Sequence, residues 1–188
     1  AGIASAVDSL PNGIKANKDA VAETIANNVR SRILQEHLNN PAYYDRMSKL
    51  LEEILADLRA RRVDYEAYLQ RMAELAKRVL LGQAPDTPEI LRTRPWLRAV
   101  YDNLVAKAST AVAMAVHEPP AAALGAPDNP TLTLALAIDE TVRRMRPDDW
   151  RGHQAKENEI KRALLPLLRN DPQEVERIFL IVKAQREY

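Results

Sequence analysis

Apolar residues recur along most of this chain at the steps of three and four that place side chains on one face of an α-helix. The first such stripe comprises Val21, Ile25, Val29 and Ile33. An Asn-Asn-Pro run at 39–41 is expected to end that helix. Further helices are expected over residues 96 to about 116, 131–145, 157–168 and 172–185. The pattern predicts an all-α fold, a helical bundle.

The longest pattern runs from Pro41, which suits a first helical turn, to Gly82, which suits a C-cap. Its seam is heptad-like and comprises Tyr44, Ser48, Leu51, Leu55, Leu58, Arg62, Tyr65, Leu69, Met72, Ala76 and Val79. It predicts one long helix over about 41–81, around which the bundle is built. Because Arg62 is a polar member of the seam, the alternative is two helices that meet near Asp64, with Asp64 as N-cap.

Breaker residues divide the chain into a lead-in and one helical domain. Residues 1–17 are expected to be a lead-in or linker, because a Pro-Asn-Gly run interrupts them. The domain is expected over 18–188, with a sub-division at a Pro/Ala-rich loop at about 117–130. Prolines in 82–95 allow at most short helical turns, and 147–152 is expected to be a turn.

Composition narrows the classes of function. The 188 residues include no Cys, which excludes disulfides and thiolate zinc sites. No apolar run is long enough to cross a bilayer and the first ten residues do not resemble a signal peptide, so a soluble, cytoplasmic protein is expected. The formal net charge of +1, from 27 basic and 26 acidic residues, argues against a domain that holds nucleic acid mainly by charge.

Motifs for catalysis or cofactors are absent or out of context. The five glycines are isolated, so no glycine-rich loop can hold a phosphate group. The three histidines are far apart, which favours surface or helix-end roles over metal binding. We therefore expect no catalytic, cofactor-binding or metal-binding residue in this chain.

One catalytic pattern needs closer inspection. Pro147-Asp148, followed by Glu159 and Lys161, has the spacing of a Mg²⁺-dependent nuclease site. Such a site needs Glu and Lys on a strand, where residues two apart share a face. In a helix they point about 200° apart. We interpret the match as coincidence.

Arginines cluster at three places: Arg59/Arg61/Arg62, Arg92/Arg94/Arg98 and Arg143/Arg144/Arg146 with Arg151 nearby. Solvated helix faces paired with Asp and Glu are the favoured interpretation of any one cluster. The last cluster is the best candidate for partner or phosphate contact, because it flanks Trp150 and Gly152 in the expected turn. Five tyrosines suit half-buried packing better than stacking on bases: Tyr43, Tyr44, Tyr65, Tyr68 and Tyr101.

Four segments and the chain end carry a family resemblance. They are Glu23-Thr-Ile-Ala-Asn-Asn-Val-Arg30 with Ile33, Tyr43-Tyr-Asp-Arg-Met-Ser-Lys-Leu-Leu51, Tyr101-Asp-Asn-Leu104, Trp150-Arg-Gly152 with Lys156-Glu157 and Ile160 to Leu164, and Val182 to Tyr188. Together they resemble the C-terminal helical region of the R (motor and restriction) subunit of type I restriction-modification enzymes. Two features depart from that pattern: His153 stands where Asn is expected, and 117–130 looks like an insertion.

The resemblance implies a longer bacterial or archaeal parent protein, a type I site-specific deoxyribonuclease. Its upstream domains would hold the Mg²⁺-dependent nuclease and the ATP-dependent motor, so ATP and Mg²⁺ are expected there and not in this chain. The helical region is expected to dock the motor onto the methyltransferase core of modification and specificity subunits. The alternative is a module that contacts duplex DNA. Candidate contacts with the partner or DNA are Asn27, Asn28, Arg30, Arg143, Arg144, Trp150 and Arg151. For the two asparagines, hydrogen bonding within the bundle is an equal alternative.

Overall fold

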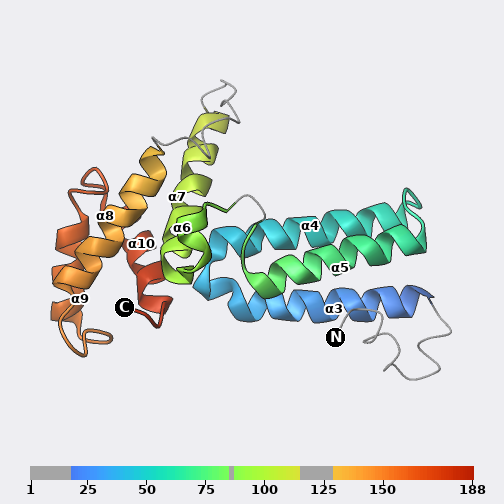
Figure 1. The fold of residues 1–188 in the computed structure, drawn as a ribbon, viewed down its shortest axis with the longest axis horizontal. Coiled ribbons are helices and arrows are strands. Elements are labelled where there is room, and N and C mark those ends of the chain that lie inside the picture. Colours follow the sequence, from blue (N-terminus) through green and yellow to red (C-terminus); the bar gives the residue numbers. More distant parts are fainter. Residues whose placement is uncertain (1–17, 85–86, 115–128) are drawn as a thin grey trace. The chain divides into compact units, whose positions relative to one another are not determined.

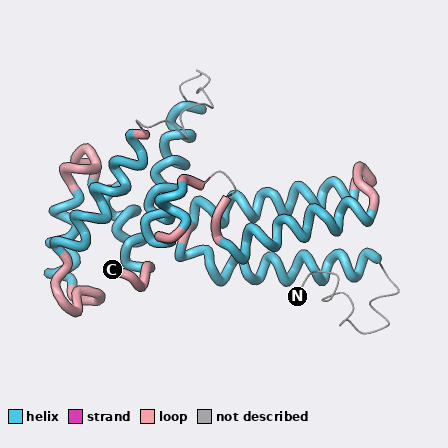
Figure 2. Tube along the Cα trace, viewed as in Figure 1, coloured by secondary structure: helices cyan, strands magenta, loops and turns pink. Residues whose placement is uncertain are grey.

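The computed structural model describes residues 18–84, 87–114 and 129–188. All secondary structure in these residues is helical (Figures 1 and 2), which confirms the all-α prediction. The elements are α3 (Lys18–Glu36), the 3₁₀ turn η1 (His37–Asn39), α4 (Pro41–Arg59), α5 (Tyr65–Leu81), α6 (Glu89–Arg92), α7 (Pro95–Met114), α8 (Pro130–Met145), α9 (Gln154–Leu164) and α10 (Pro172–Ala184). None of the described helices is long and apolar enough to cross a membrane.

The chain divides into two compact units, each with its own apolar core. Within the described residues, the first unit comprises residues 18–37 and 43–84, and the second comprises residues 38–42, 87–114 and 129–188. The predicted lead-in at 1–17 lies outside the described residues, as does most of the predicted loop at 117–130. At the end of that loop, residue 129 caps α8 and residue 130 begins it.

In the first unit, α3, α4 and α5 surround one core. The stripe predicted for α3 is buried: Val21, Ile25, Val29 and Ile33 are each at most 7% exposed. The two later helices contribute buried residues that include Tyr43, Leu51, Tyr68 and Met72. Two tyrosine hydroxyls tie the helices together, since Tyr68 donates to the Ala22 carbonyl at 2.7 Å and Tyr43 to that of Arg78 at 2.9 Å. The predicted packing role is confirmed for these two tyrosines, although both are fully buried and not half-buried.

The prediction of one long helix over 41–81 is wrong, and the two-helix alternative is correct. α4 ends at Arg59, and α5 starts after Asp64, whose side chain accepts from the Ala67 N–H at 2.7 Å. Arg61 adopts a left-handed conformation, with φ at 53°. The N–H groups of residues 61 and 62 return to the carbonyls of Leu58 and residue 57, which is a Schellman ending. The chain therefore reverses, and both halves of the seam bury their apolar faces in one core.

The second unit packs α7, α8, α9 and α10 around a core that includes Leu97, Val100, Ile138, Val142, Ile160, Leu164, Ile178 and Phe179. Asn129 and Asp171 cap α8 and α10 by accepting backbone N–H bonds, and a proline occupies the first position of each helix. The predicted turn at 147–152 joins α8 to α9. The short α6 agrees with the prediction of at most brief helical turns before residue 95.

Candidate protein-docking surfaces

The predicted contact residues of the first unit lie on the exposed side of α3. Asn27 and Asn28 are exposed. The Arg30 guanidinium donates to Asn27 Oδ1 at 2.9 Å and pairs with Glu52 Oε1 on α4 at 2.8 Å. The structure therefore brings Asn27 and Arg30 together in a link between α3 and α4, and leaves Asn28 beside them on the surface.

The Trp150-Arg-Gly152 turn is engaged within the second unit. Trp150 is only 3% exposed and meets Phe179 of α10 edge to face, with ring centroids 5.7 Å apart. Its indole ring therefore belongs to the core of the second unit. The Lys161 ammonium in turn lies over the Phe179 ring, with Nζ 4.6 Å from the ring centroid.

Arg151 secures the end of α10. Its Nε donates to the Lys183 carbonyl at 3.2 Å, its Nη2 donates to the Gln185 carbonyl, and its guanidinium lies 4.7 Å from the Trp150 ring centroid. Carbonyls at a helix C-terminus lack helical partners, and a cation there opposes the negative end of the helix dipole. Arg151 thus acts as a C-terminal cap supplied from a distant turn.

The rest of the turn is fixed by Glu157. Gly152 has a φ of 82°, and its N–H donates to Glu157 Oε1 at 2.8 Å. The same carboxylate, with 7% of its side chain exposed, pairs with Lys183 at 2.7 Å. The Lys183 hydrogen bond, followed by that from Gly152, holds the pKa of Glu157 below its ordinary value. His153 occupies the N-cap position of α9 without a side-chain capping bond.

Arg143 and Arg144 have different surroundings, although they are neighbours on α8. Arg143 Nε donates to Asp139 Oδ1 at 3.0 Å, and the guanidinium lies 5.0 Å from the Trp96 centroid and 5.3 Å from that of Tyr188. Arg144 is exposed, and no hydrogen bond or ion pair joins it to the described part of the chain. Neither arginine acts as Arg151 does, which donates hydrogen bonds to the carbonyls at the end of α10.

The nuclease-like pattern is not assembled. Asp148 and Glu159 are exposed, and Glu159 and Lys161 lie two residues apart on the α9 helix. Lys161 pairs with Glu176 of α10 at 2.6 Å. Over 18–84, 87–114 and 129–188, no three His, Asp or Glu side chains are grouped to hold a metal ion.

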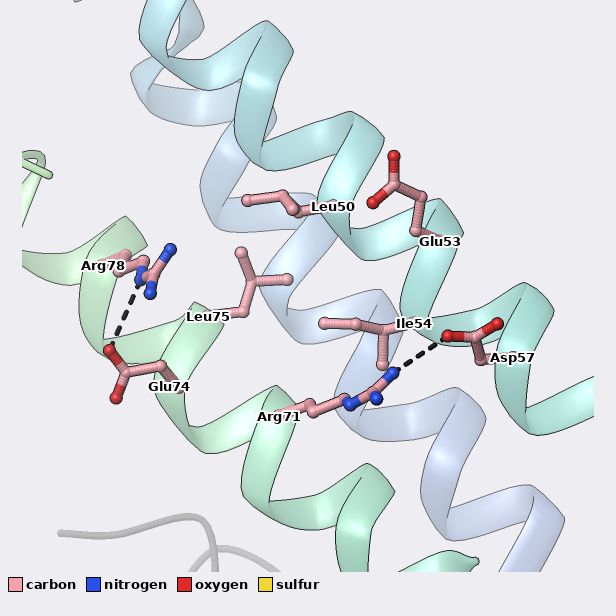
Figure 3. A pocket seen from close by; sticks show the side chains of 8 residues that line it. All are labelled: Leu50, Glu53, Ile54, Asp57, Arg71, Glu74, Leu75 and Arg78. Atoms are coloured by element: carbon pink, nitrogen blue, oxygen red, sulfur yellow. Dashed lines mark hydrogen bonds and ion pairs between the residues drawn. The ribbon is translucent and has the colours of Figure 1, made fainter. Parts of the chain in front are cut away.

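A groove between α4 and α5 was missed from the sequence (Figure 3). Its floor is apolar, from Leu50, Ile54 and Leu75, and its sides carry Glu53, Asp57, Arg71, Glu74 and Arg78. The Arg71 guanidinium bridges to Asp57 at 2.9 Å across one end, while Arg78 and Glu74 pair along α5 at 3.4 Å. The available signal was Leu50 and Ile54, an apolar pair four residues apart beside the seam.

The size and charge of this groove fit a protein side chain better than a small ligand. Its volume of about 270 Å³ lies below the roughly 300–1,000 Å³ of small-molecule pockets. Glu53 is exposed on the α4 side and forms no ion pair with a described residue. Two helical turns from each of α4 and α5 line it, which matches the length over which an amphipathic helix presents an apolar stripe.

Comparison with protein-family models, with curated proteins and with solved structures finds no match to this chain. Its function is therefore inferred from its residues and their geometry.

Proposed function

We propose that this chain is a non-catalytic assembly domain, and that the α4/α5 groove receives a helix of a partner protein. The observation that supports the proposal is the groove itself, which combines a partly open apolar floor with a charged rim. An apolar side chain of the partner would contact Leu50 and Ile54, and a basic residue one turn away would pair with Glu53. Helix-in-groove recognition commonly uses such anchors at helical spacing.

The proposed partner is the methyltransferase core of a type I restriction enzyme, made of modification and specificity subunits. The resemblance supports this choice. The Trp150-Arg-Gly152 segment, which contributes to this resemblance, forms a turn in the second unit, and Arg151 of that turn donates to the carbonyls at the end of α10. The ATP-dependent motor and the nuclease would belong to upstream domains of the parent.

Direct DNA contact is the weaker candidate. Arg151 already donates to two carbonyls of the second unit. Several of the predicted arginine contacts are exposed, but Arg144 is the one that also forms no hydrogen bond or ion pair with a described residue. If the chain contacts DNA directly, its affinity for duplex DNA in a gel-shift assay should fall steeply with salt. The Arg144→Ala variant should also bind the duplex more weakly.

Co-purification with the methyltransferase core of the same restriction system tests the proposal. The tagged chain should retain the core. Failure to do so, under conditions in which the full R subunit retains it, overturns the assigned function.

Two charge-reversal variants test whether the partner binds in the α4/α5 groove. Glu53→Lys should weaken binding about threefold, as expected for a rim charge. Glu23→Lys is the control, because Glu23 is an exposed acid on α3 that makes no ion pair with a described residue. Neither variant removes a contact of the fold, so equal binding by both would exclude the groove.

An apolar pair of variants tests the floor. Ile54→Asp should reduce affinity about tenfold or more, as at an interface hot spot. Leu80→Asp makes the same chemical change at a residue 71% exposed and away from the groove, and should leave affinity unchanged. Thermal unfolding of both variants separates lost binding from lost structure.

A further inference from the structure

Asp139 of α8 is the centre of a hydrogen-bonded cluster in the second unit. Its Oδ1 accepts from the Trp96 indole N–H at 3.1 Å, from the Tyr188 hydroxyl at 2.7 Å and from Arg143 Nε at 3.0 Å. The residue is only 8% exposed, and Tyr188 is 3% exposed. The cluster therefore fixes both aromatic rings and the base of the Arg143 guanidinium.

The Arg143 guanidinium is held in place but not enclosed. It lies over the rings of Trp96 and Tyr188, at 5.0 and 5.3 Å from their centroids, while 39% of its side chain remains exposed. Within the described residues its Nη groups form no hydrogen bond. Four N–H donors are thus immobilised at the surface, and a ligand that binds them would not have to order the side chain.

We propose that Arg143 is an anchor for a carboxylate of a partner protein, with Trp96 packing beside it. This rests on the proposed assembly function and adds a contact in the second unit. A planar guanidinium binds a carboxylate through two parallel hydrogen bonds. Arg and Trp are also the residue types in which interface binding energy concentrates.

A single carboxylate fits this surface better than a nucleic-acid backbone. Glu140 is exposed one turn before Arg143 on α8, and Glu187 is exposed beside Tyr188 in sequence. These acids would repel the successive phosphates of a polyanion.

Affinity for the methyltransferase core tests the anchor in the full chain. Arg143→Gln should weaken binding about tenfold or more, and Arg143→Lys should restore only part of it, because an ammonium lacks the planar fork. Arg144→Gln, which removes the neighbouring exposed arginine, should change affinity less than twofold. Equal affinities for Arg143→Gln and wild type overturn the anchor while leaving the assembly function intact.

A second measurement needs neither a variant nor the core. The ¹⁵N–¹H resonance of Arg143 Nε is followed while a glutamate-containing tripeptide or inorganic phosphate is added to the wild-type chain. The tripeptide should shift the Arg143 signal more than that of Arg144, and more than phosphate does. Equal shifts of the two arginines overturn the anchor, and a larger response to phosphate replaces it with a phosphate site. Failure of the wild-type chain to bind the core, which the separate co-purification measures, overturns only the assembly function.

Discussion

Replacing Arg61 by Gly is expected to stabilise the first unit. Arg61 has a φ of 53°, in the left-handed region where a residue with a side chain costs about 1 kcal/mol more than glycine. Its side chain is exposed and makes no ion pair with a described residue, so the substitution removes no contact. The free energy of unfolding should therefore rise by about 1 kcal/mol.

Arg59→Gly is the matched control. Arg59 is the last residue of α4 and is also exposed. Both substitutions remove one arginine from the same turn, two positions apart. Glycine in a helix costs about 0.5–1 kcal/mol, so Arg59→Gly should lower the free energy of unfolding, with a sign opposite to that of Arg61→Gly.

Urea unfolding and thermal unfolding, both followed by circular dichroism, measure the two effects. For a unit of this size, 1 kcal/mol corresponds to a shift of about 4–8 °C in Tm, which is readily resolved. If Arg61→Gly destabilised the chain as Arg59→Gly does, residue 61 would lie inside a helix. The reasoning from the Schellman ending would then be refuted, and one helix over 41–81 would be restored.

Three further changes test the second unit and the core of the first. His153→Asn should raise Tm by supplying the missing N-cap bond of α9, worth about 1 kcal/mol; an unchanged Tm contradicts this. Asp139→Ala should lower the free energy of unfolding by about 2 kcal/mol or more, because it leaves buried donors unsatisfied, whereas exposed Glu140→Ala should change it by less than about 0.5 kcal/mol. Burial raises the pKa of Tyr68 to about 12 from 10.0, so its contribution to stability is complete below pH 10 and is lost as pH rises toward 12. Tyr68→Phe should reduce the loss of stability measured by urea unfolding between those pH values, and an unchanged slope would contradict the assignment.

Local patterns were sufficient to predict most of the helices but not the reversal after α4. The stripe of α3 and the prolines before α8 and α10 act within a few residues, so periodicity and capping rules locate those elements. The reversal uses Arg61 where glycine is usual, and the apolar seam keeps its steps from Leu58 through Arg62 to Tyr65. Without a breaker, the pattern of a hairpin and that of a continuous helix are the same.

The roles of the candidate arginines depended on partners far along the chain. Arg151 is satisfied by carbonyls that follow it by 32 and 34 residues, at the end of α10. Nothing in the sequence near the turn marks those carbonyls as its acceptors. Likewise, the groove exists because α4 and α5 form a hairpin, which the seam did not reveal.

The hydrogen-bond acceptors around Arg151, which stabilises the fold, differ from those around Arg143, which is proposed to bind a partner. Arg151 donates to two backbone carbonyls through Nε and Nη2, which ties it to the end of α10. Arg143 meets one carboxylate oxygen, and that oxygen also serves Trp96 and Tyr188. The cluster is therefore sufficient to immobilise the Arg143 guanidinium but not to satisfy it. Its Nη donors form no hydrogen bond within the described residues, and under the proposal a single partner carboxylate would accept from them.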